Sequence, residues 1–102
     1  MIESKPESEF PTLQQFTALI DSPFTALTAQ DTLVLRLSEA NALSGGTPGR
    51  SEPFSLIFSG SIKARLTQGT YALEHRELPT LQIFLVPIGV SESEALYEAV
   101  FN

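Results

Sequence analysis

Short runs in which core-facing and outward-facing positions alternate occupy most of this chain, and they indicate β-strands. In residues 32–39, Leu33, Leu35 and Leu37 alternate with positions that include Arg36. A period of two places the leucines on one face of a strand and the arginine on the other. A second run, residues 24–28, precedes it across a three-residue link that is short enough for an antiparallel hairpin.

The second half of the chain contains four more apolar runs, each about five or six residues long. They are rich in aromatic and branched residues and are bounded by Gly, Pro, Ser or Glu, which is typical of half-buried strands. The runs are residues 54–58, 71–75, 81–86 and 96–101.

Residues 81–86 differ from the other runs because they are apolar at every position except Gln82. This pattern predicts a central strand that is covered on both faces and closed by Pro87 and Gly89. Residues 54–58 and 96–101 are among its expected partners.

A helical period occurs near the N-terminus. Leu13, Phe16, Leu19 and Ile20 recur at the spacing of one helix face, and Thr12 is a suitable N-cap. An Asp-Ser-Pro sequence then stops the pattern. We therefore predict a helix of about two turns over residues 12–20 that covers one opening or face of the sheet.

Three segments have weaker patterns. Residues 1–9 mix Glu, Ser, Lys and Pro, which predicts a flexible acidic arm. Residues 44–52 contain three glycines and a proline without an apolar anchor, which predicts a flexible loop. In residues 61–68, three apolar residues alternate with Lys63 and Arg65, which predicts a short exposed strand with both cations facing water.

Six or seven short strands joined by turns predict a mainly β fold with antiparallel pairing. We expect a small β-barrel or roll with the short N-terminal α-helix as a lid; a two-sheet sandwich is the alternative, because the strands are unequal in length. With 102 residues, 42% of them hydrophobic, the chain has the size and composition of one globular domain. This domain spans residues 10–102 and follows the arm.

The charge and the cysteine content of the chain exclude several classes of function and site. Twelve Asp and Glu residues outnumber six Lys and Arg residues, and the cations are scattered apart from Lys63 and Arg65. A formal net charge of −6 argues against nucleic-acid binding, which depends on clustered cations. The absence of cysteine excludes disulfides and thiolate metal sites.

The N-terminus has acidic residues where a secretory signal needs a basic start. The longest apolar stretch, residues 83–88, is too short to cross a bilayer. We therefore expect a soluble protein that is cytoplasmic at synthesis and has no membrane span.

His75 is the first candidate for catalysis, because it is the one side chain that ordinarily titrates near neutral pH. Glu74 and Glu77 are close in sequence, but a strand places Glu74 and His75 on opposite faces. A lone histidine at a strand end without a partner group is typical of a structural or exposed residue. We expect no catalytic residue and no enzymatic activity.

Metal and phosphate sites have equally weak support. Glu74, Glu92, Glu94 and Glu98 match no metal-binding motif, and a loop with several oxygen ligands at fixed positions is missing. The Gly-rich sequence of residues 45–50 lacks the Gly-Lys-Ser/Thr ending of a phosphate loop. We expect neither a metal nor another cofactor.

Contact with a protein partner, or self-association, is the expectation that remains. The candidate contact residues are Arg50, at the tip of the Gly-rich loop, the Lys63/Arg65 pair, and Phe84. Phe84 and Ile57 face away from the main apolar sets of their strands, so they would contact a second layer: the helix, a loop or another subunit.

Five segments carry a resemblance. These segments are Pro53-Phe-Ser-Leu-Ile-Phe58, Gln68-Gly-Thr-Tyr71, Leu73-Glu-His75, Phe84-Leu-Val-Pro-Ile-Gly89 and Tyr97-Glu-Ala-Val-Phe-Asn102. Through them the chain resembles a family of small bacterial domains of unknown function. The resemblance implies a self-contained domain, and the family is associated with tail-collar proteins of the phage-tail type. It assigns no site residue.

Together these expectations favour a non-enzymatic interaction or assembly domain, accessory to a tail-like or fibre protein or part of a surface assembly. A small-molecule binder with its pocket inside the barrel is the alternative. An enzyme of unknown type is the third possibility.

Overall fold

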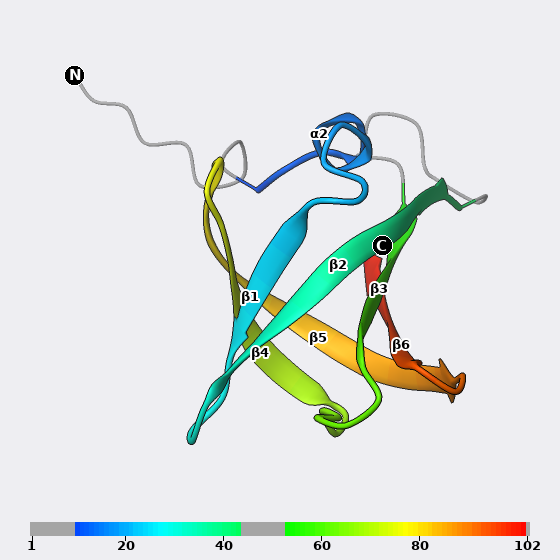
Figure 1. The fold of residues 1–102 in the computed structure, drawn as a ribbon. Helices are drawn as coiled ribbons and strands as arrows, with labels where there is room; N and C mark the ends of the chain where they lie inside the picture. The colour runs from blue at the N-terminus through cyan, green and yellow to red at the C-terminus, as the bar shows by residue number, and fades with distance from the viewer. Residues whose placement is uncertain (1–9, 44–52, 102) are drawn as a thin grey trace.

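Six antiparallel strands close into one barrel in the order β1-β2-β3-β6-β5-β4 (Figure 1). The computed structural model describes residues 10–43 and 53–101. The predicted barrel is therefore confirmed, and the sandwich alternative is wrong. The elements are helix α2 (Leu13–Thr17) and strands β1 (Pro23–Leu27), β2 (Thr32–Ala42), β3 (Phe54–Ser61), β4 (Gly69–His75), β5 (Leu78–Val90) and β6 (Glu94–Phe101).

Large apolar side chains fill the interior of the barrel. The predicted alternation holds in β2, where Leu35 and Leu37 are buried and Arg36 is exposed. Phe24 of β1 meets Phe58 of β3 edge to face, with 5.4 Å between the ring centroids. The largest fully buried side chains are Phe16, Phe24, Leu35, Leu37, Leu56, Phe58, Leu73, Ile83, Leu85 and Tyr97.

Helix α2 is shorter than the sequence predicts. The expected N-cap is confirmed: the Thr12 side chain accepts a hydrogen bond from the Gln15 N–H, and the Gln15 side chain accepts one from the Thr12 N–H. The predicted extension to Ile20 is wrong, because residues 18–20 form a tighter turn. Asp21, with φ 75°, then turns the chain so that its N–H donates to the Leu37 carbonyl of β2.

Helix α2 lies at one end of the barrel (Figure 1), and an aromatic cluster connects it to the strands there. Phe16 is fully buried, and its ring centroid lies 5.8 Å from that of Phe54 and 6.4 Å from that of Phe101. Phe10 adds a contact of 5.2 Å to Phe101. The helix therefore covers an end of the barrel, as a lid would, and leaves the outer faces of the strands uncovered.

Strand β5 differs from the predicted central strand. Gln82 and Phe84 are exposed, so the prediction that both faces are covered is wrong. The strand also continues to Val90, because a register shift between Pro87 and Gly89 accommodates the proline within the ladder. Its neighbours are β4 and β6; β3 is separated from it by β6.

The prediction of a strand over residues 61–68 is wrong, because β3 ends at Ser61 and residues 62–68 form a loop. The backbone of this loop forms bonds outside any ladder. Leu66 N–H donates to the buried Tyr97 hydroxyl at 2.9 Å, and Ile62 N–H donates to the Ser93 carbonyl at 3.2 Å. Burial of Leu66 then anchors the loop, so that alternation within it does not produce a strand.

We predict that the two tyrosines that hold this loop contribute unequally to stability. Tyr97→Phe leaves the Leu66 N–H buried without its acceptor and should lower the free energy of unfolding by about 1–3 kcal/mol. Tyr71→Phe removes a more exposed bond, from the Tyr71 hydroxyl to the Thr67 carbonyl, and should cost about 0.5 kcal/mol or less. Urea denaturation measures both values, and equal losses would contradict the assignment.

Candidate functional site

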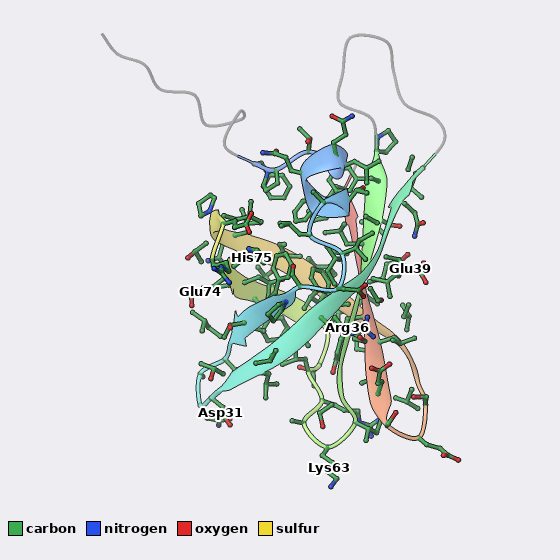
Figure 2. All side chains as sticks on the ribbon, turned by 45° about the horizontal axis from the view of Figure 1, so that its top comes forward. Asp31, Arg36, Glu39, Lys63, Glu74 and His75 are labelled. Carbon is green, nitrogen blue, oxygen red and sulfur yellow. The ribbon has the colours of Figure 1, made fainter. Side chains whose placement is uncertain are left out.

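His75 lies on the inner side of β4. It is buried, and its neighbour Glu74 is exposed on the outer face (Figure 2). The imidazole packs against Phe24, with 4.6 Å between the ring centroids. The predicted placement of these two residues on opposite faces is confirmed.

The hydrogen bonds of His75 assign its tautomer. The backbone N–H of Glu77 donates to Nδ1 at 3.0 Å, so Nδ1 is an acceptor and Nε2 carries the proton of the neutral ring. Nε2 lies 2.9 Å from the Ser22 hydroxyl oxygen and therefore donates to it. The Ser22 hydroxyl donates in turn to the Leu19 carbonyl.

This chain of bonds has the wrong direction for nucleophilic catalysis. An activated serine donates its proton to the histidine, and a further group on Nδ1 orients the ring. Here the Ser22 hydroxyl proton points to the Leu19 carbonyl, and a backbone N–H occupies Nδ1. The geometry fits a structural role, in which His75 connects β4 to the turn that follows α2.

The carboxylates considered from the sequence do not converge. Glu74 and Glu98 lie on β4 and β6, with β5 between them. Glu94 instead pairs with Arg36 at 3.5 Å, and Arg36 also pairs with Asp21 at 3.0 Å. Within residues 10–43 and 53–101, no group of three or more His, Asp or Glu side chains is placed to hold a metal ion.

The predicted partner-contact residues lie on different parts of the surface. Lys63 projects from the loop between β3 and β4, at one end of the barrel, and Arg65 follows it in the same exposed loop (Figure 2). Phe84 lies on the outer face of β5, opposite Thr70 of β4, and Thr70 and Arg65 line one shallow groove. Arg50 lies outside the described residues.

Five neighbouring side chains form what we call the outer patch: Ile57, Phe84, Val86, Glu98 and Val100. Ile57 of β3 and Val86 of β5 each pair with Glu98 of β6, so the three form one cross-strand row. Val100 lies two residues along β6 on the same outward side, and Phe84 lies two residues along β5. Phe84 is 50% exposed and Val100 is 51% exposed.

The sequence pattern pointed to Phe84 and Ile57, whereas Val86 and Val100 were missed. A signal was present, since alternation in the last strand places Tyr97, Ala99 and Phe101 on one side. The residues between them, which include Val100, must then face the other way. Their proximity to Phe84 depends on the pairing of β5 with β6, which strand alternation does not specify.

Comparison with protein families shows to which family the chain belongs. The profile of a domain of unknown function, DUF6916, matches residues 11–101, which include every strand and the helix. The chain belongs to the DUF6916 family. No curated protein and no solved structure matches it. The expected membership in an uncharacterised domain family is thus confirmed, and the whole described barrel of this DUF6916 domain lies within the match.

A membrane-spanning helix is not found in the described part of the DUF6916 domain: α2 has five residues, and no helix there is long and apolar enough to cross a bilayer.

We predict that Ser22 and His75 are energetically coupled. Ser22→Ala, His75→Phe and the double variant form a cycle in which the phenylalanine preserves the contact with Phe24. The hydrogen bond should give a coupling free energy of about 1 kcal/mol in urea denaturation. Glu74→Gln, on the exposed face of the same strand, is the control and should change stability by about 0.5 kcal/mol or less. A coupling near zero would show that the bond contributes nothing.

Proposed function

We propose that this DUF6916 domain is a non-enzymatic protein-interaction or assembly module that contacts its partner through the outer patch. The exposed Phe84 and Val100, on the same face of adjacent strands, carry this proposal. Large apolar side chains exposed side by side, rather than singly, are characteristic of surfaces that bind other macromolecules. Among the partner-contact residues predicted from the sequence, Phe84 is the one that the proposal uses.

The barrel interior favours contact over ligand capture. A pocket inside the barrel would need space that Phe24, Phe58 and Ile83, together with the other buried side chains, already fill. The groove beside Arg65 and Thr70, with a volume of about 500 Å³, lies at an end of the barrel and is open to solvent. A small-molecule binder therefore has less support than an interaction module.

The role of His75 also supports a non-enzymatic function. Both of its ring nitrogens are engaged: Nδ1 accepts from the Glu77 N–H in the turn after β4, and Nε2 donates to Ser22 in the turn that follows α2. The Ser22 hydroxyl donates to the Leu19 backbone carbonyl. The most reactive side chain of the described structure is thereby used to hold elements together.

We further propose that the partner belongs to a tail-like or fibre assembly, whether in the cytoplasm, where the chain is made, or at a surface. The resemblance of the Phe84-Leu-Val-Pro-Ile-Gly89 and Tyr97-Glu-Ala-Val-Phe-Asn102 sequences to a family associated with tail-collar proteins supports this proposal. Both sequences contribute residues to the outer patch.

A site-specific crosslinking experiment tests the interaction. A photoreactive phenylalanine at position 84 should capture a defined protein in lysate of the source organism. The same residue at position 34 is the matched control, because Val34 is 64% exposed but lies on β2, where it pairs with β1. We expect capture at 84 and none at 34, since a binding surface is local.

Two further measurements complete the test. Light scattering of the purified chain determines whether the captured species is a second copy. Phe84→Ser should abolish capture through a crosslinker at position 86, and Val34→Ser should leave it unchanged. A strict monomer that captures nothing at position 84 would contradict the proposal.

A further inference from the structure

Strand β5 has a free edge along part of its length. It pairs with β4 from Leu78 to Leu85, and with β6 only from Val86 to Val90. On the side of β6, residues 81–85 therefore have no ladder partner within residues 10–43 and 53–101. Their backbone N–H and C=O groups on that side constitute an unpaired sheet edge in the middle of a folded strand.

Strand β6 has the complementary edge. Residues 99–101 pair with β3 and have no partner on β5, and Figure 1 shows the two strands diverging from the turn that joins them. Among the described residues, no loop or turn backbone forms a hydrogen bond with residues 81–85 or 99–101. The inward side chains Ile83, Leu85 and Ala99 remain buried, so the opening is a gap in backbone pairing, with the core still closed behind it.

The outer patch surrounds this gap. Phe84 lies on the β5 edge and Val100 on the β6 edge, and both are about half exposed. Val86 and Glu98 form the pair at which the two strands begin to diverge. An extended segment on the free edge would pair through its backbone and would place apolar side chains against Phe84 and Val100.

The charges beside the gap are acidic. Glu39 of β2 and Glu98 of β6 both pair with Ile57 in the backbone register, so two carboxylates flank one isoleucine. Neither glutamate forms an ion pair within residues 10–43 and 53–101, where Arg36 pairs with Asp21 and Glu94 instead. A second copy of this chain would add like charges here, and each copy carries a net charge of −6.

From these observations we infer that the partner contributes an extended, apolar segment with a flanking Lys or Arg, which adds as a strand to residues 81–85 of β5. The basic residue lies next to Glu98, where β5 and β6 meet, and the apolar residues cover Phe84 and Val100. This inference rests on the proposed interaction function and defines the class of partner.

A titration of the full chain with designed peptides tests the inference. The probe is the acetylated, amidated peptide Lys-Thr-Val-Ile-Val-Thr-Lys, which has a lysine at both ends and so suits either strand direction. Nuclear magnetic resonance of the ¹⁵N-labelled chain should show shifts and slower amide exchange at residues 81–85 and 99–101. The amides of β1 and of the first half of β2 should not change.

Two altered peptides separate the contributions. Methylation of alternate backbone nitrogens removes at least two hydrogen bonds and preserves the side chains, so the affinity should fall about tenfold or more. Glutamate in place of both lysines should weaken binding by a similar factor, since it places like charges at Glu98. Glu98→Lys should reverse the preference between the lysine and glutamate peptides; Glu77→Lys, in the turn between β4 and β5, should not.

The outcomes are distinct. Equal affinity for the methylated and unmodified peptides would show that the edge is not used, and absence of any change at residues 81–85 would overturn the inference. The crosslinking at position 84 decides the proposed function separately. If a partner is captured there but the amides of residues 81–85 do not exchange more slowly, the proposed interaction function stands and strand addition is rejected.

Discussion

The whole structure depends on how six short strands share their backbone hydrogen bonds around one core. Each strand of a closed barrel must pair on both sides, and the neighbours are staggered along it. β5 shows the consequence: its first part pairs with β4, its last part pairs with β6, and in the described part of the chain residues 81–85 have one neighbour only. The closure between β1 and β4 is similarly short, with three paired positions. Both features follow from closing the barrel.

Side chains hold the structure where the ladders are short. The rings of Phe10, Phe16 and Phe101 cluster at the end of the barrel beside the β5/β6 gap. Near the β1/β4 closure, the contact between His75 and Ser22 connects β4 to the turn before β1. Aromatic packing and one partly buried hydrogen-bond chain thus supplement backbone pairing, and the residue with the greatest chemical versatility is used for stability.

The same geometry gives the outer surface its character. A helix on the outer face of β5 would have covered Phe84; because α2 covers the barrel end, that face remains apolar and open to contact. The free edge and the apolar side chains adjoin each other since both arise where β5 and β6 separate. Glu39 and Glu98 add a negative charge beside that edge, and under the proposed function this charge would select a basic partner segment.

The sequence by itself determined the β class, the Thr12 cap and the placement of Glu74 and His75 on opposite faces, because these follow from local periods and side-chain chemistry. It favoured a barrel but left a sandwich open, and strand pairing decided between them. It did not determine that residues 62–68 form a loop, or that β5 is exposed at Phe84. Those outcomes depend on distant groups: the Tyr97 hydroxyl that holds Leu66, and the packing of Phe16 on Phe54 and Phe101, which places α2 at the barrel end. Alternation along one strand shows which side chains share a face, whereas only the pairing of strands decides what lies beside that face and which edges remain open.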